Sequence, residues 1–455
     1  MADFAAMVDA QRKYFDSQAT KPYEFRREQL KKLQGWMTEN EQAILDALHE
    51  DLGKSDYEGY LTEVAMVKQE LADALKHLRG WMKPKRARTA MGQLPGTCRV
   101  LSEPYGVVLI MSPWNYPFQL TLAPLLGALA AGNCAIVKPS AYSPATSGLI
   151  RRMAEELFPS ELVKVVEGGR TENAALLEEH FDYIFFTGSP AVGRLVMEKA
   201  SRHLTPVSLE LGGKSPVIVD KSADIALTAR RLAWGKCLNA GQTCVAPDYV
   251  LVDRSREQEL IEALIGEIRR MYTSAPLASE DLPKIVNQRH FQRLVGLLSS
   301  GSVAFGAQID PAERKISPTI LTDVEWDSPV MQEEIFGPIL PILTYRNLDE
   351  AIQRIRQRPR PLALYLFTRD KAVEDKVLGS VSFGGGCVND TVLHLATCHM
   401  PFGGVGESGM GGYHGPWSFR TFSHEKSILK RWAKPDIALR YAPFRGKMGK
   451  LKKLI

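Results

Sequence analysis

The sequence has no apolar run that could cross a membrane. Its longest apolar stretch, from Leu120 to Ala131, contains Pro124 and is shorter than the roughly 20 residues that a spanning helix needs. The first residues carry charges throughout and have no apolar core, which argues against a secretory signal. These absences predict a cytoplasmic protein, with peripheral membrane contact as an alternative.

Cysteine is scarce, and none of the six cysteines stands in a CxxC pair or at the spacing of a Cys/His zinc site. We therefore expect no metal site. In a reducing compartment a free thiol persists and can act as a nucleophile.

The chain also has little excess charge of either sign. The net charge is +5 over 455 residues, and no basic stripe is interleaved with aromatic side chains, which argues against a nucleic-acid partner. An apolar content of 45% and a charged content of 24% are typical of a soluble globular protein. A chain of this length is expected to form two or three domains.

The first eighty residues favour helices. Thr38 and Glu41 have the spacing of a capping box, and Gly53 marks a helix end. A second amphipathic helix is predicted over 57–79. The basic, turn-rich segment 83–102 favours an extended hairpin or arm.

From Tyr105 onward, short apolar runs typical of buried parallel strands alternate with helical stretches. The strands predicted first are Val107–Met111, Cys134–Lys138, Val163–Val166, Tyr183–Thr187 and Val207–Leu211. Those predicted later are Val217–Val219, Tyr249–Val252, Ala363–Phe367 and Gly386–Asn389. This alternation predicts an α/β fold, a doubly wound Rossmann-like domain followed by a second α/β domain.

We place the first, cofactor-binding domain at 1–82 and 103–210 and the catalytic domain at 211–397. A small β arm for oligomerisation and a C-terminal tail take 83–102 and 398–455. Polar residues, glycine and proline follow the predicted strand ends, where open α/β sheets bind ligands. Loops commonly contain glycine, so a site at this edge and ordinary loops remain equally good explanations.

Two residues stand out as candidates for chemistry. Glu210 lies inside an apolar strand, where a carboxylate is costly unless it is paired or functional. Cys244 follows Gly241, Gln242 and Thr243 in a small polar loop, which favours an exposed sulfur, whereas the helical surroundings of Cys237 favour packing. A buried Glu210 paired to a lysine or a backbone amide is the alternative for the carboxylate.

Gly188 to Gly193 follow a strand and open a helix, as phosphate-binding turns do, although the spacing is not GxGxxG. By itself the segment fits an ordinary helix start better. Lys138, at a strand end, could be a solvated lysine or a partner for ribose hydroxyls.

Together these segments resemble the aldehyde dehydrogenase superfamily over nearly the whole chain. The matching motifs are MSPWNYPF (111–118), KPS (138–140), FFTGSPAVG (185–193), LELGGKSP (209–216), NAGQTC (239–244), EEIFGP (333–338) and PFGG (401–404), in the family's order. The class 3 and fatty aldehyde branch is indicated by GQTCVAPDYV (241–250), VNDTVLH (388–394), PFGGVGESGMGGYHG (401–415) and SFRTFSHEKSIL (418–429).

The resemblance implies an NAD(P)-dependent enzyme that oxidises aldehydes to carboxylic acids. Cys244 attacks the carbonyl carbon, and the side chain of Asn115 with the Cys244 N–H stabilises the oxyanion. Hydride departure leaves a thioester, which water activated by Glu210 hydrolyses. These residues must converge in the interdomain cleft.

The implied cofactor contacts are also carried over from the family. Lys138 binds the adenosine ribose, Gly188 to Gly193 face the pyrophosphate, Glu334 holds the nicotinamide ribose and Phe336 lies against its ring. The complete set is Trp114, Lys138, Gly188, Ser189, Val192, Gly193, Leu211, Glu334 and Phe336. Many NAD-using relatives carry an acidic residue where this chain has Ala141, so NADP is expected to be tolerated, alone or beside NAD.

Substrate choice is less visible in the sequence. Tyr60, Tyr116, Trp234 and Phe402 could line an apolar funnel or simply pack the core. By resemblance, medium to long aliphatic or aromatic aldehydes are favoured. His394 and His414 are expected to serve packing or an interface.

The C-terminal segment 440–455 places Met448, Leu451 and Ile455 on one helical face among lysines. A solvated basic end explains this, and weak contact with an anionic membrane surface is the sharper hypothesis. The family makes its dimer contacts through the arm and the last fifty residues, so a homodimer is expected.

Two other functions compete with this interpretation. A binding protein that had lost catalysis would lack Cys244, Glu210 or Asn115, and a variant that passes the acyl group to coenzyme A generally lacks the carboxylate of Glu210. All three residues are present. A papain-like hydrolase is excluded because no cysteine stands in a CGSCW-type element.

Overall fold

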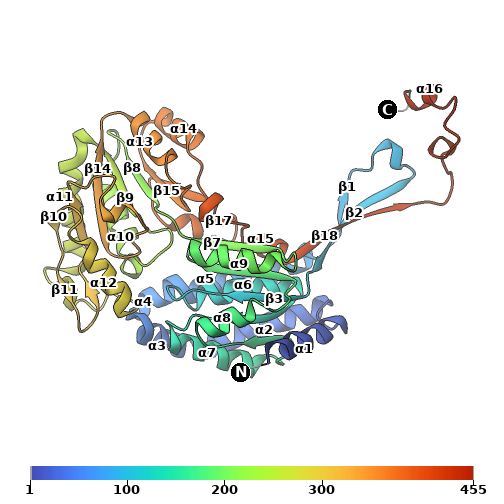
Figure 1. The fold of residues 1–455 in the computed structure, drawn as a ribbon, viewed down its shortest axis with the longest axis horizontal. Coiled ribbons are helices and arrows are strands. Elements are labelled where there is room, and N and C mark those ends of the chain that lie inside the picture. Colours follow the sequence, from blue (N-terminus) through green and yellow to red (C-terminus); the bar gives the residue numbers. More distant parts are fainter. Residues whose placement is uncertain (1–2, 454–455) are drawn as a thin grey trace.

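Two α/β lobes lie against each other, and a thin arm projects from the first of them (Figure 1). The computed structural model describes residues 3–453. Among these residues no helix is long and apolar enough to cross a membrane. The two-lobed α/β architecture with a β arm confirms the predicted fold class.

The first lobe is built on a six-stranded sheet with the order β17-β7-β6-β3-β4-β5. Its strands are β3 (Val107–Met111), β4 (Cys134–Lys138), β5 (Val163–Val165), β6 (Tyr183–Gly188), β7 (Val207–Leu211) and β17 (Gly409–Met410). All neighbours are parallel except β17, which pairs antiparallel with β7. The five predicted strands are confirmed, because apolar runs buried on both faces favour parallel pairing.

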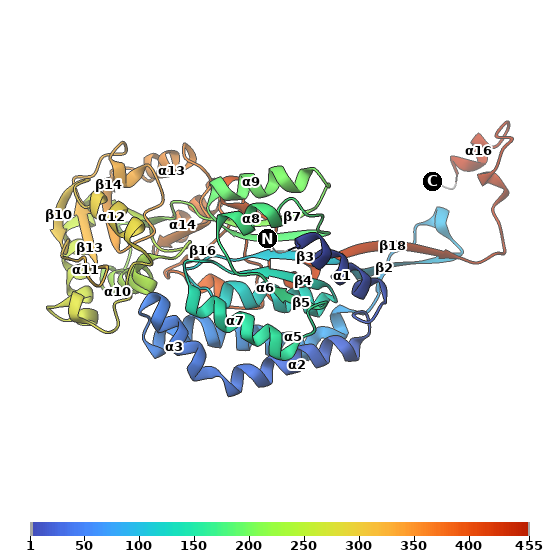
Figure 2. The same ribbon diagram turned by 60° about the horizontal axis from the view of Figure 1, so that its bottom comes forward.

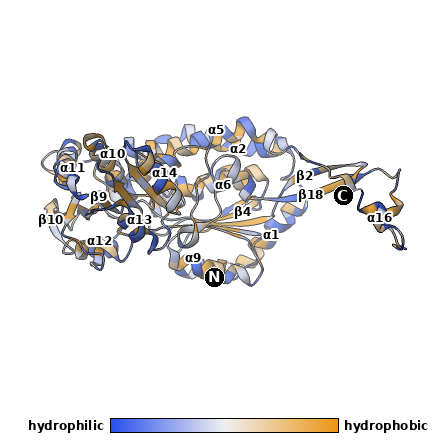
Figure 3. Ribbon diagram, turned by 90° about the horizontal axis from the view of Figure 1, so that it is seen from above, coloured by the Kyte–Doolittle hydropathy of each residue, from blue (hydrophilic) through white to orange (hydrophobic). Residues whose placement is uncertain are grey.

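Helices cover both faces of this sheet, as Figure 2 shows. They are α1 (Phe4–Asp16), α2 (Tyr23–Glu39), α3 (Glu41–Leu52), α5 (Ala65–Trp81), α6 (Gln119–Ala131), α7 (Pro144–Leu157), α8 (Arg170–Leu176), α9 (Pro190–Ser201) and α15 (Pro416–Thr421). Helix α6 is buried on every side, whereas the outer helices show mixed polar and apolar residues (Figure 3).

Two helix boundaries differ from the sequence prediction. The capping box at Thr38 is wrong, because Thr38 lies in the last turn of α2 and its hydroxyl donates to the Gln34 carbonyl, while Asn40 precedes α3. The helix predicted over 57–79 consists of α4 (Asp56–Gly59), a π-helical turn η1 (Tyr60–Val64) and α5. Gly53 ends α3 in the left-handed conformation, as predicted.

The second lobe contains a seven-stranded sheet with the order β10-β13-β14-β9-β8-β15-β16. Its strands are β8 (Pro216–Val219), β9 (Tyr249–Asp253), β10 (Ser302–Phe305), β13 (Thr319–Thr322), β14 (Ile339–Tyr345), β15 (Ala363–Phe367) and β16 (Gly385–Val388). Its helices are α10 (Ile225–Cys237), α11 (Glu257–Tyr272), α12 (Gln288–Leu297), α13 (Leu348–Arg356) and α14 (Lys371–Ser380). The sequence prediction found β8, β9, β15 and β16 but missed the other three strands.

The arm is a three-stranded antiparallel sheet of β1 (Lys85–Ala87), β2 (Gly96–Pro104) and β18 (Ser423–Arg431), extended by α16 (Met448–Leu451). The segment between the second lobe and β18 returns to the first lobe, where it supplies β17 and α15. The domain boundaries given above stay a prediction.

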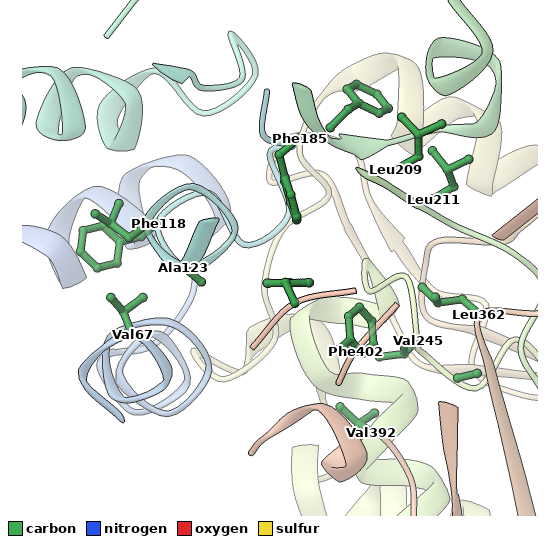
Figure 4. Close-up of a cluster of buried hydrophobic side chains, with 14 of the residues drawn as sticks. Val67, Phe118, Ala123, Phe185, Leu209, Leu211, Val245, Leu362, Val392 and Phe402 are labelled. Carbon is green, nitrogen blue, oxygen red and sulfur yellow. The ribbon is translucent and has the colours of Figure 1, made fainter. Parts of the chain in front are cut away.

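One continuous apolar core joins the two lobes. Figure 4 shows Phe185, Leu209 and Leu211 of the first sheet near Val245 and Phe402, which the second part of the chain supplies. Because packed interiors deform little, this shared core holds the strand ends of both sheets in a fixed relation.

Candidate active site

The strand order of the first sheet reverses direction between β3 and β6. From β3 the chain adds β4 and β5 on one side, and later β6 and β7 on the other. Ligands of doubly wound sheets bind at such a switch point, beyond the carboxyl ends of the strands. The loop that follows β3 carries Trp114 and Asn115, and the turn that follows β6 carries Gly188 and Ser189.

Cys244 lies in a tight loop that follows α10. The turn η3 (Leu238–Gly241) places Asn239 and Ala240 in the left-handed region, and Gly241 also has a positive φ. A Cβ at Gly241 would collide with the Gly337 carbonyl oxygen, so only glycine fits there. The loop leaves Cys244 half-buried at the wall of a cavity, whereas Cys237 is fully buried in α10, as predicted.

Burial raises the pKa of the Cys244 thiol to about 12, and the charges of Glu334 and Glu210 raise it further. An uncharged thiol is therefore the resting form near neutral pH. The reactive thiolate requires either a base or a nearby positive charge.

Glu210 occupies the fourth position of β7 and is buried to 3% exposure. Both of its carboxylate oxygens lack a hydrogen-bond partner among the described residues. Burial raises the pKa of this carboxyl well above its usual range. A desolvated carboxyl group without a partner is suited to accept a proton from water.

Asn115 is buried beside the nucleophile loop. Its side-chain Nδ2 donates to the Gln242 carbonyl over 3.0 Å. A primary amide has two N–H groups, so one donor of Asn115 remains for another acceptor. Gln242 is itself fixed through its Nε2, which donates to the carbonyls of Asn239 and Lys284.

The cavity beside Cys244 is lined mainly by apolar side chains. Three of the four aromatic residues suggested by the sequence, Tyr116, Trp234 and Phe402, lie in its wall. Tyr60 is not among the wall residues, and its side chain is exposed in the π-helical turn. The sequence did not indicate the aliphatic part of the wall, to which Leu61, Met66, Leu120, Val392, Leu393 and Leu395 contribute.

Lys138 ends β4 with its ammonium group turned to backbone carbonyls. It donates to Pro139 O over 2.8 Å and to Gly168 O over 2.7 Å. Burial lowers the pKa of Lys138 to about 8. The side chain is thus held at the sheet edge rather than solvated.

The turn from β6 into α9 has the features of a phosphate-binding loop. Pro190 takes the first position of α9, and no side chain caps the N–H groups of that end. A Cβ at Gly193 would lie 2.6 Å from Leu211 Cδ2, so glycine permits the close approach of α9 to β7. Ser189 and Val192 are exposed at the same helix end.

Phe336 contacts Trp114, and Glu334 lies beside Gly212 beyond the end of β7. The Trp114 and Phe336 rings are 5.3 Å apart in an edge-to-face arrangement. A Cβ at Gly212 would collide with Glu334 Oε2, so this glycine gives the carboxyl group its place at the end of β7. Burial raises the pKa of Glu334 to about 8.

The two histidines singled out by the sequence have local partners. His414 is buried and its Nδ1 lies 2.6 Å from Glu70 Oε1, while His394 Nδ1 lies 3.7 Å from Cys387 Sγ. Both contacts fit packing roles. An interface role for either stays a prediction.

One group of metal-type side chains lies apart from these residues. The ligand atoms of Asp73, Cys398 and His399 are within 4.8 Å of one another. Asp73 Oδ1 also contacts His77 Nδ1 at 2.8 Å, which is an ordinary ion pair or hydrogen bond. The expectation that the protein has no metal site stays a prediction.

Comparison with known proteins agrees with this geometry. The model of the aldehyde dehydrogenase family matches residues 1–428. The chain is 48% identical to 4,4'-diaponeurosporen-aldehyde dehydrogenase of Staphylococcus aureus, over 96% of both chains. It is also 48% identical to human aldehyde dehydrogenase family 3 member B1, over 95% of this chain and 93% of the relative.

Solved structures extend the likeness to the fold. The substrate-bound state of Staphylococcus aureus AldH superposes with a TM-score of 0.98 at 47% identity, covering 100% of this chain and 99% of that one. An indole-3-acetaldehyde dehydrogenase complexed with NAD+ gives a TM-score of 0.86 at 26% identity, over 94% and 88%. The predicted class 3 resemblance is confirmed, and the chain belongs to the aldehyde dehydrogenase family, which oxidises aldehydes to carboxylic acids with NAD or NADP.

Proposed function

We propose that Cys244 is the nucleophile of this oxidation and that Glu210 is its general base. The support for both roles is one arrangement. A half-buried sulfur lies at the wall of an apolar cavity, and the charge of a buried carboxylate that has no partner in the described part of the chain acts on it. A base of raised pKa can take protons near neutral pH.

The Cys244 thiol passes its proton to water, and the resulting thiolate attacks the carbonyl carbon, whose oxygen becomes negative. The free N–H of Asn115 and the backbone N–H of Cys244 donate to this oxygen. Bound NAD or NADP supplies the acceptor for the hydride that leaves the same carbon. Glu210 then takes a proton from water, whose oxygen attacks the thioester, and the acid departs as the C–S bond breaks and Cys244 regains its proton.

The nucleophile is tested by Cys244→Ala, which is expected to reduce no detectable coenzyme in the presence of aldehyde. Cys237→Ala is a matched control, because that buried sulfur lies in α10 outside the cavity. The proposal fails if Cys244→Ala keeps the wild-type rate.

The cofactor residues are proposed on the same basis. Gly188, Ser189, Val192 and Gly193 would face the pyrophosphate at the uncapped start of α9. Lys138 would bind the adenosine ribose, and Glu334 the nicotinamide ribose. Trp114, Phe336 and Leu211 would complete the pocket.

Ala141 is exposed beyond β4, and it places no carboxylate there to repel a 2′-phosphate. We therefore propose that NADP is accepted, alone or beside NAD. The ratio of kcat/KM for the two cofactors measures this, and strict use of NAD contradicts it.

The substrate class is proposed from the wall of the cavity. Apolar aliphatic and aromatic side chains line it, so medium to long aliphatic or aromatic aldehydes fit better than small hydrophilic ones. The relative from Staphylococcus aureus acts on 4,4'-diaponeurosporen-aldehyde by its name. A series of aldehydes of increasing chain length should show rising kcat/KM.

A homodimer through the arm is proposed because β18 exposes apolar side chains and β1 leaves its outer edge unpaired in the described chain. The tail is proposed to touch anionic membranes weakly, because Phe444, Met448 and Leu451 are exposed near lysines, whereas Ile455 lies outside the described residues. Equal vesicle co-sedimentation of the full chain and of a chain ending at Phe444 would reject the membrane contact.

A further inference from the structure

A second set of buried charges lies beside the proposed oxyanion site, and the mechanism above does not use it. Lys54 follows α3, and Glu63 lies in the π-helical turn η1. Their side chains have 0% exposure, and Lys54 Nζ lies 2.5 Å from Glu63 Oε1. An ion pair removed from water in this way is often less stabilising than apolar residues of the same volume.

The Lys54 ammonium group also contacts Asn115, the proposed oxyanion residue, and its neighbour Tyr116. Its Nζ donates to the backbone carbonyl of Asn115 over 3.0 Å and lies 4.0 Å from the centre of the Tyr116 ring. The same carbonyl accepts a bond of 2.7 Å from Asn239 Nδ2 in the nucleophile loop. The Asn115 backbone is therefore held from the first lobe and from the second at once.

Glu63 binds the backbone at the other end of the same loop, where α6 begins. Its Oε2 accepts the N–H groups of Phe118 at 2.8 Å and of Gln119 at 3.1 Å. These donors stand at the start of α6, where a negative charge is favourable. The ion pair thus joins the backbone on both sides of the short segment 115–119.

The π-helical turn that carries Glu63 is itself unusual. π-Helical turns are rare in proteins, and those that do occur are often found at functional sites. Another carboxyl group, that of the half-buried Glu58, precedes this turn and accepts the Asn239 N–H over 2.6 Å. The segment 54–63 therefore contacts both the Asn115 loop and the Cys244 loop.

We propose that Lys54, held by Glu63, is a positioning residue that sets the Asn115 amide at the distance the oxyanion requires. This inference rests on the proposed role of Asn115. The pair adds no reacting group. It fixes the backbone from which the Asn115 side chain reaches the substrate oxygen, and displacements of about 1 Å in such groups cost up to 10²-fold in rate.

The test is a double-mutant cycle between Lys54→Met and Asn115→Ala. Lys54→Met keeps the length of the side chain but removes its donors. It is expected to lower kcat about 10- to 100-fold, with the Kd for the dinucleotide unchanged. In the Asn115→Ala background the same substitution is expected to lower kcat by less than about twofold, since the group it positions is absent.

Arg26→Met is the matched control. Arg26 is a buried cation that donates to the carbonyls of Thr20 and Ala130, away from the cavity. It is expected to lower thermal stability but to leave kcat unchanged. If Lys54→Met does not fold, the doubly uncharged Lys54→Met, Glu63→Gln protein is measured in both backgrounds instead.

An equal fold loss of kcat in both backgrounds would overturn the positioning role, as would an unchanged kcat in Lys54→Met. If Asn115→Ala alone kept the wild-type kcat, the oxyanion assignment would be what fails. Any loss of kcat in Lys54→Met would then have a cause other than the position of Asn115. Failure of the positioning role and failure of the oxyanion assignment therefore give different results.

Discussion

Glu210 and Glu63 are both buried carboxyl groups near the Asn115 and Cys244 loops, but their surroundings are opposite. Glu63 accepts three hydrogen bonds, from Lys54 Nζ and from two backbone N–H groups. Glu210 accepts none from the described residues. Burial raises the pKa of each, yet only Glu210 is left with acceptor capacity that a water molecule can use.

The difference separates two uses of a buried carboxyl group. A buried carboxyl group whose hydrogen bonds are all made acts by fixing the positions of its partners, because each hydrogen bond restricts the motion of the group that donates it. An unsatisfied group is kept in an unfavourable state that the rest of the fold must offset, and such groups cluster where chemistry occurs. On this view Glu210 belongs to the reaction and Glu63 to the positions of its neighbours.

The largest expected effect is on turnover. Glu210→Gln should lower kcat about 10²- to 10⁴-fold, because the water loses its base. Thioester formation does not need that base, so the first turnover should still give a burst of reduced coenzyme equal to the enzyme concentration. Rapid-mixing measurements of reduced coenzyme check this. A mutant without the burst would place Glu210 before hydride transfer.

The free energy of unfolding should depend strongly on Glu63 and little on Glu210. Glu63→Gln leaves Lys54 buried without its counter-charge, so we expect a loss of about 3–5 kcal/mol in the free energy of unfolding. Glu210→Gln removes a desolvated group that has no partner among the residues described, so it should not destabilise the protein at neutral pH. Urea unfolding of both variants measures this difference. Equal losses of unfolding free energy in the two variants would contradict it.

A smaller effect per pH unit is the dependence of stability on pH. The raised pKa of Glu210 means that the folded protein binds a proton more tightly than the unfolded chain does. This contribution is fully present below the pKa of the unfolded chain and is lost as pH rises toward the folded pKa. Relative to Glu210→Gln, wild-type stability should fall above about pH 4.5 by at most about 1.4 kcal/mol per pH unit.

Unfolding curves of both proteins at pH 5 and pH 8 check this slope. An identical pH dependence in the two proteins would mean that Glu210 finds a partner in solution.

Much of the fold was predictable because the signals are local. The apolar runs of β3, β4, β6 and β7 specify strands wherever both faces are covered. The missed strand β10 is mostly exposed and β13 begins and ends with threonine, so neither contains a long apolar run, and β14 contains Pro341, which weakens its pattern. The capping box at Thr38 failed because the chain continues from α2 into α3 through Asn40.

By itself the sequence determined the strand and helix alternation, the family and the residues of its motifs, because each is a pattern in nearby residues. Only the tertiary structure decided that Tyr60 is exposed outside the cavity wall and that Glu210 has no partner among residues 3–453. It alone brought Lys54 and Glu63 to Asn115, 61 residues beyond the lysine. Pairing and burial depend on which distant segments pack together, and a charged residue gives no local sign of them.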